Sequence, residues 1–261
     1  VMVSRVAESA AAAMEGTPGV AGMTHSADGF RHRGASATRL EAFVDAAFAF
    51  AVTLLVVSFD HVPGTLDELT AAMRKVPAFL AGFAVVAMFW AAHSRFSRRF
   101  GLEDGPVAVL SFLLVATVLV YIFPLRVLMS WMMAFFTGGW APTELQLGTA
   151  EEARAVYLIY GVGFLAMNLW VVLLNAHALR RADHLQLDAG ERLLTRAECA
   201  VHGIMAASAL LSIALALLLP LDRSWQWALP GLAYALLCVV MPIYGVRIGK
   251  AHARVTAASA S

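Results

Sequence analysis

Charged residues are scarce in this chain: Asp, Glu, Lys and Arg make up only 14% of its 261 residues. Soluble domains carry about a quarter charged residues, and here 60% of the residues are hydrophobic. The composition therefore predicts an integral membrane protein surrounded by membrane lipid. The formal net charge of +1 argues against the strongly basic face that nucleic-acid binding needs, so we expect no nucleic-acid partner.

Cysteine is also sparse, since the chain contains only Cys199 and Cys238, and they lack metal-ligand spacing. The sequence has no phosphate-binding glycine loop, no nucleophile elbow and no HExxH pattern. His177, His184 and His202 form no ligand set with helical spacing. These absences predict a protein that is not an enzyme and that holds no metal or cofactor.

Long apolar runs, by contrast, are abundant. About 20 residues at about 1.5 Å per residue cross the roughly 30 Å of bilayer hydrocarbon. The runs are continuous rather than alternating, which favours helices over a membrane barrel. Six segments are long enough: 39–59, 76–95, 107–128, 156–174, 200–219 and 227–246. The sequence therefore predicts an all-α membrane domain with six transmembrane helices over residues 38–250.

The two ends of the chain differ from this domain. Residues 1–37 are rich in Ala, Gly and Ser, and Glu8 and Glu15 interrupt any signal-peptide core. We therefore expect a disordered N-terminal tail, and a second tail over residues 251–261.

The positive charges indicate an orientation. If both ends are cytoplasmic, the inner segments hold fourteen Lys and Arg residues and the outer segments hold five. The positive-inside rule therefore predicts a multi-pass protein of the cell membrane with both termini in the cytoplasm.

The first span begins with charged residues. Arg39 and Asp45 are six positions apart, which separates them by about 240° around a helix, so they cannot pair with each other. Asp45 needs donors from another helix or contact with water, because a carboxylate within a membrane is costly. Trp90 and His93 on the second span share a helical face and carry N–H donors. The alternatives are a helix-start carboxylate favoured by the helix dipole and an interfacial histidine without a specific role.

The remaining face of the first span carries an apolar stripe. Phe50, Leu54 and Val57 follow the i, i+4, i+7 spacing, with Thr53 beside them. Such stripes usually serve packing or lipid contact. The other interpretation is a hydrophobic constriction that gates a pore by dewetting.

Two blocks of the sequence resemble a known family. "RLEAFVD", residues 39–45, is followed by an apolar run with Thr53 and is similar to the RxxxFSD signature of the transmembrane protein 175 family of potassium channels. "FWAAHSRF", residues 89–96, resembles the FWxxHHRxF pattern on the second helix of those proteins. The resemblance implies a homotetramer of six-helix subunits whose first helices surround the path of the permeant potassium ion. The sequence has no TVGYG filter, so it resembles no classical potassium channel.

The resemblance also implies roles for single residues. Phe50, Leu54 and Val57 would form successive apolar rings, and Thr53 would be a neighbouring polar lining residue. The signature residues Arg39, Phe43 and Asp45 would tie the first helix to Trp90 and His93 on the second.

Three positions depart from the family pattern. Val44 stands where the signature has serine, Ser94 replaces the second histidine of the pair, and Phe50 stands where prokaryotic members commonly have leucine or isoleucine. The first two changes weaken the polar network, and four phenyl rings around one axis could close a pore more tightly.

Three hypotheses of function follow. The first is a potassium-favouring cation channel that conducts passively through a tetrameric pore. The second is a secondary transporter linked to protons through Asp45 and His93, although spans four to six contain no second copy of "RLEAFVD". The third is a non-conducting membrane scaffold related to the channels.

Overall fold

The computed structural model describes residues 29–34, 37–56, 63–143, 147–220 and 224–260, and long helices dominate them. The prediction of an all-α protein is confirmed. The helices are α2 (Arg39–Val56), α3 (Leu66–Met73), α4 (Val76–Phe100), α5 (Gly105–Phe136), α6 (Ala150–Arg180), α7 (Ala189–Leu218), α8 (Leu232–Ala235) and α9 (Leu237–Ala260), with a 3₁₀ segment η1 (Ser224–Gly231) before α8.

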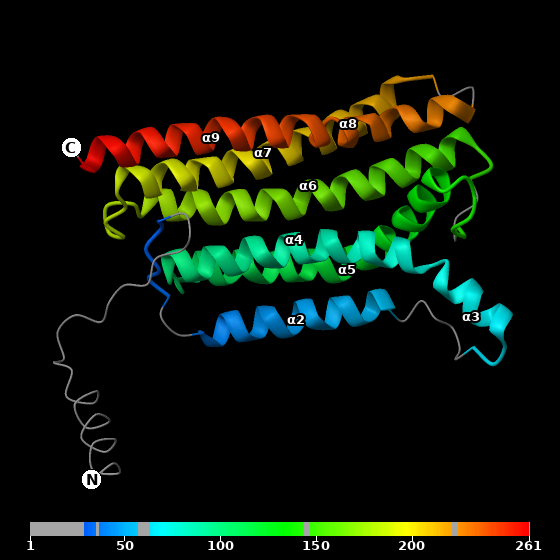
Figure 1. The fold of residues 1–261 in the computed structure, drawn as a ribbon, viewed down its shortest axis with the longest axis horizontal. Coiled ribbons are helices and arrows are strands. Elements are labelled where there is room, and N and C mark those ends of the chain that lie inside the picture. Colours follow the sequence, from blue (N-terminus) through cyan, green and yellow to red (C-terminus); the bar gives the residue numbers. More distant parts are fainter. Residues whose placement is uncertain (1–28, 35–36, 57–62, 144–146, 221–223, 261) are drawn as a thin grey trace, which may run out of the picture.

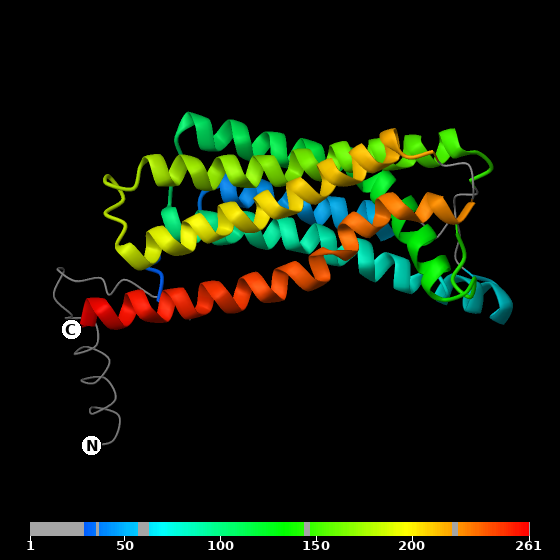
Figure 2. The same ribbon diagram turned by 90° about the horizontal axis from the view of Figure 1, so that it is seen from above.

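The long helices lie side by side in one elongated bundle (Figure 1). Helix α2 lies at one edge and packs against α4 and α5. Helices α6 and α7 follow, and α9 lies at the opposite edge, beside α7. The view from above shows α9 running along the outside of the bundle (Figure 2). Helix α2 is therefore an outer helix of the single chain, with only one side covered.

Among the described residues, five helical segments are long and apolar enough to cross a membrane: Leu66–Phe100, Gly105–Phe136, Ala150–Arg180, Ala189–Leu218 and Leu229–Ala257. Helix α2, the first of the six predicted spans, is not among them. Its 18 described residues include the charged residues Arg39, Glu41 and Asp45, and the last predicted residues of this span, 57–59, lie outside the described residues.

Several helices extend beyond the predicted spans. Helix α5 has 32 residues and α6 has 31, which corresponds to about 45–50 Å and exceeds the roughly 30 Å of hydrocarbon. Polar caps stabilise the extra turns. The Asp104 side chain accepts from the Val107 N–H at 3.3 Å, and capping boxes begin both α6, with Thr149, and α7, with Asp188.

Residues 29–34 belong to the segment that was expected to be disordered, and for them this expectation does not hold. Phe30 is fully buried, and its ring packs edge to face on that of Phe100, with 5.5 Å between the centroids. The backbone N–H groups of Arg33 and Gly34 both donate to the carbonyl of Arg98 at 3.1 Å. The Phe30 ring and these two backbone hydrogen bonds thus anchor the segment to α4.

The boundary expected at residue 251 is not seen either, because α9 continues to Ala260 without a break. Alanine is the best helix former, and three of the last residues of this helix are alanines. The helix therefore extends beyond its apolar residues.

The main core lies between α2, α4, α5 and α6. Phe89 of α4 is fully buried at its centre. Its ring centroid lies 6.0 Å from that of Phe164 on α6 and 6.2 Å from that of His202 on α7. Phe89 therefore joins α4 to the two helices that follow it in the bundle.

Helices α5 and α6 approach closely at Gly163. A Cβ at Gly163 would overlap the ring of Tyr121, which is held because its hydroxyl donates to the carbonyl of Tyr160 at 3.1 Å. We expect Gly163→Ala to destabilise the protein by about 1–3 kcal/mol, the usual cost of overpacking. The measurement is the thermal unfolding midpoint in detergent.

Gly203→Ala on α7 is the matched control, because a Cβ there meets nothing within 4 Å. This variant should be neutral or gain up to about 1 kcal/mol from helix propensity. Equal thermal unfolding midpoints for the two variants would contradict the close approach of α5 and α6 at Gly163.

Candidate functional site

Helix α2 has two different faces. Glu41, Val44, Phe48, Ala51 and Leu55 are buried against the rest of the chain. The opposite face carries Thr53 and Phe50, and Phe50 remains 56% exposed. A large aromatic side chain left open on an outer helix is typical of a surface that meets lipid or another subunit. This exposed face is the candidate site.

The predicted ring residues and the predicted lining residue Thr53, where the structure describes them, differ in their exposure. Phe50 and Thr53 are exposed, and the Thr53 hydroxyl donates to the carbonyl of Phe50 at 2.7 Å within the helix. Leu54 is half-buried and packs against the core of its own chain. Val57 lies outside the described residues. Of the three that the structure describes, Phe50 and Thr53 thus have the most exposed side chains.

Asp45 and Trp90 are brought together. The indole Nε1–H of Trp90 donates to the Asp45 carboxylate at 2.8 Å and so links α2 to α4. Both side chains are exposed, with 42% for Trp90. The contact supplies the donor that Asp45 needs at the head of the helix.

His93 and Arg39 do not join this contact. His93 is 1% exposed, and its Nε2 lies 2.9 Å from the Ser111 hydroxyl on α5. His93 therefore links α4 to α5 rather than to α2. Arg39 is exposed and makes no ion pair or hydrogen bond with any residue that the structure describes. Its place in the first turn of α2 directs it away from Asp45.

Phe43 also has a different partner from the expected one. Its ring packs edge to face against Phe112 of α5, with 5.4 Å between the centroids and an interplanar angle of 85°. Of the three signature residues and their two expected partners, only Asp45 and Trp90 make a polar contact between the first two predicted spans within the described part of the chain.

Val44 is fully buried in the core and faces away from the exposed side of α2. A serine at this position would place a hydroxyl in an apolar environment and would require a partner there. Valine requires no hydrogen-bond partner, so at this position the chain has core packing in place of the polar contact that a serine would make.

Removing the Trp90 donor tests the link between α2 and α4. Trp90→Phe keeps a ring but loses the N–H, and hydrogen bonds to charged groups contribute about 1.5 kcal/mol or more. We expect the thermal unfolding midpoint in detergent to fall by about 2–4 °C per kcal/mol lost.

Trp131→Phe is the control for this variant, because the Trp131 indole stacks on Phe135 at 6.5 Å and makes no hydrogen bond within the described part of the chain. A Trp90→Phe midpoint no lower than that of Trp131→Phe would argue against the link.

Sequence reasoning missed several polar residues that the structure brings together. Ser111 stands alone in an apolar run, and nothing in its spacing identifies it as the partner of His93. Glu191 is 2% exposed and binds Arg31 and Arg33. The capping box from Asp188 to Glu191 was the available signal that a helix begins there.

Among the described residues, no cluster of His, Cys, Asp or Glu is suited to hold a metal ion.

Comparisons with known proteins agree with the sequence blocks around this site. A family model described as the endosomal/lysosomal potassium channel TMEM175 matches residues 39–124. The chain is 30% identical over 221 residues to a potassium channel of Marivirga tractuosa, and this alignment covers 83% of the chain and 89% of that relative. It is also similar to the crystal structure of the potassium channel MtTMEM175 T38A variant in complex with a nanobody–MBP fusion protein. This structural match has a TM-score of 0.74 and a sequence identity of 28%, and it covers 87% of this chain and 100% of the other chain. The chain therefore belongs to the TMEM175 family of potassium channels.

Proposed function

We propose that the protein is a potassium-favouring cation channel that conducts passively, with its pore at the exposed face of α2. The observation that carries this proposal is Phe50, which is 56% exposed on a helix whose other face is buried. The names of its relatives, both potassium channels, support the choice of ion.

In the proposed assembly, four copies of the chain surround one axis. Their α2 helices turn Phe50 and Thr53 toward that axis, followed by Leu54 at the edge of the face and then by Val57. The Phe50 rings form the constriction, which would close by excluding water rather than by binding the ion. Potassium is the permeant ion and the channel requires no cofactor.

In this proposal α2 is the first of six transmembrane helices, even though it carries three charged residues. Glu41 is buried within its own chain. Packing against other subunits shields Arg39 and Asp45 from lipid, and Trp90 provides a donor for Asp45. Both termini are cytoplasmic, because that orientation places fourteen of the nineteen Lys and Arg residues on the inner side of the cell membrane.

Flux measurements on the full-length protein in liposomes test the proposal. Vesicles loaded with potassium are diluted into a sodium medium, and a protonophore with a pH-sensitive dye reports the proton uptake that balances potassium efflux. We expect efflux that follows the potassium gradient, and when the two ions exchange sides we expect proton movement in the opposite direction, because a potassium-favouring channel then lets potassium in. Protein-free vesicles serve as the blank, and valinomycin added at the end shows that all vesicles held their gradient.

Two other outcomes would replace the channel with one of the alternative functions. Saturable flux that depends on an imposed proton gradient would indicate a transporter. An absence of flux in both the natural protein and a Phe50→Ala variant would indicate a non-conducting scaffold.

A further inference from the structure

A buried carboxylate is held by two arginines at the end of the bundle where α7 begins. Glu191 is 2% exposed and lies in the first turn of α7. Arg31 donates to it from Nε at 3.0 Å and Nη2 at 2.7 Å. Arg33 donates from Nη1 at 3.1 Å and Nη2 at 2.8 Å. Paired, charge-assisted bonds of this kind fix orientation as well as adding energy. We call Arg31, Arg33 and Glu191 the Glu191 cluster.

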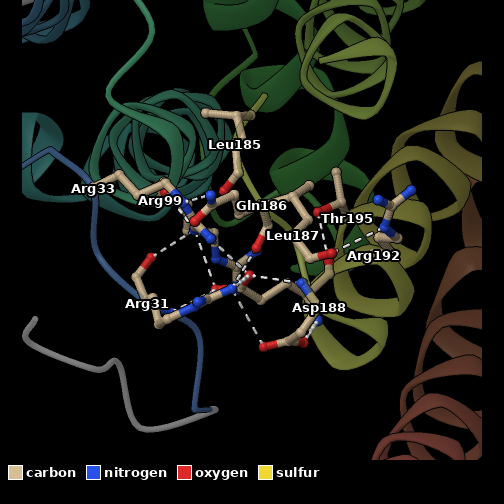
Figure 3. Close-up of polar contacts among 10 residues, drawn as sticks. Arg31, Arg33, Arg99, Leu185, Gln186, Leu187, Asp188, Arg192 and Thr195 are labelled. Atoms are coloured by element: carbon tan, nitrogen blue, oxygen red, sulfur yellow. Dashed lines mark hydrogen bonds and ion pairs between the residues drawn. The ribbon is translucent and has the colours of Figure 1, made fainter. Parts of the chain in front are cut away.

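The same arginines hold the turn between α6 and α7 (Figure 3). Arg31 Nη2 donates to the carbonyl of Gln186 at 2.6 Å, and Arg33 Nε donates to the carbonyl of Leu185 at 3.0 Å. Gln186 has a φ of 49°, a left-handed conformation that costs energy in a residue other than glycine. Hydrogen bonding to Glu191 raises the pKa of Arg31 above its ordinary value. The turn is thus held in one shape by two charged side chains.

The segment that carries these arginines is also fixed on α4. The Arg99 guanidinium lies 4.8 Å from the centroid of the buried Phe30 ring. A Cβ at Gly34 would lie only 2.7 Å from the carbonyl oxygen of Ser97, so this approach of two backbones requires glycine. Residues 30–34 are therefore attached to α4 on one side and to the α6–α7 turn on the other.

Helix α2 begins almost immediately after this segment. The Thr38 hydroxyl accepts from the Glu41 N–H at 3.1 Å and caps the first turn of α2. Helix α2 itself packs against α4 and α5, whereas Glu191 belongs to α7. The Glu191 cluster therefore adds an attachment between the start of α2 and a different helix.

We propose that the Glu191 cluster positions the start of α2 and that potassium flux depends on this attachment. The proposal rests on the proposed function, because the position of α2 affects flux only if this helix lines the pore. None of the three residues belongs to the exposed Phe50 and Thr53 face, so they are positioning residues that act through α2.

Hydrogen exchange on the full-length protein in detergent tests the positioning directly. Glu191→Gln keeps the shape of the side chain and removes the charge that both arginines bind. We expect backbone amides in the first turns of α2 to exchange at least about tenfold faster, the factor for losing one charge-assisted hydrogen bond. Amides in the middle of α6 serve as the internal reference and should keep their rates. Equal acceleration in both helices would mean general loosening and would overturn the proposal.

Two further variants keep the test decisive. Asp183→Asn is the matched control, because Asp183 pairs with Arg192 at 2.6 Å in the same turn but is 97% exposed, and it should leave α2 unchanged. Arg31→Lys keeps the positive charge but loses the paired bonds, so α2 should exchange moderately faster. If Glu191→Gln does not fold, unchanged α2 exchange in Arg31→Lys is sufficient to reject the proposal.

Potassium flux is the second readout. Glu191→Gln is expected to change the flux per protein several-fold relative to the natural protein, and Asp183→Asn should leave it unchanged. Faster exchange in α2 with unaltered flux would show that the cluster does not position α2 for conduction. If the natural protein conducts no potassium, the proposed function fails, and the exchange experiment still decides whether the cluster holds α2.

Discussion

Replacing Phe50 with alanine is expected to raise potassium flux through the reconstituted protein about tenfold or more. Phe50 is 56% exposed and makes no ring contact within the described part of its own chain. In the proposed tetramer, four phenyl rings would meet at the axis, and truncating them would widen the constriction and let water enter. A tenfold gain corresponds to a barrier lower by about 1.4 kcal/mol, which is modest for the removal of four rings.

The measurement is the liposome flux assay with equal amounts of each protein. Phe123→Ala is the matched control, because Phe123 on α5 is 60% exposed but does not belong to α2. This variant should conduct at the rate of the natural protein. A gain in Phe123→Ala without one in Phe50→Ala would place the ion path at another helix.

Phe89→Ala is expected to lower the free energy of unfolding by about 3 kcal/mol. Phe89 is fully buried and joins α4 to Phe164 on α6 and to His202 on α7, so truncation leaves a cavity between three helices. Phe→Ala costs about 3–5 kcal/mol in soluble cores. The lower end applies here, because lipid adds little hydrophobic force between helices and packing supplies most of the stability.

Thermal unfolding in detergent measures this effect. Phe83→Ala on the same helix is the control, since Phe83 is 41% exposed and its removal leaves no comparable cavity. The Phe83→Ala midpoint should stay near that of the natural protein, while the Phe89→Ala midpoint falls clearly below both. Similar midpoints for the two variants would mean that Phe89 is not the centre of the core.

Local patterns were enough to predict much of this fold. Five of the six apolar runs correspond to helices that can cross a membrane. The need of Asp45 for a donor, and the N–H on Trp90, identified a contact that the structure contains. Both inferences rest on residue chemistry and on helical periodicity, which a sequence displays directly.

Pairings between distant residues could not be predicted in the same way. His93 presents the same donor chemistry as Trp90, but its bond goes to Ser111 on α5, because the rotation of α4 directs it into the core. Sequence spacing gives the relative angle of two residues on one helix and not the direction in which that helix faces. The same limit applies to Leu54, which shares a stripe with Phe50 yet is partly covered by its own chain.

The attachment of α2 to α7 also has a consequence for the order in which the chain is made. Arg31 precedes Glu191 by 160 residues, so at about 5–20 residues per second it leaves the ribosome roughly 8–32 seconds earlier. During that interval α2 can pack against α4 and α5 but lacks the attachment to α7. A chain that stops before Glu191 therefore never gains that attachment.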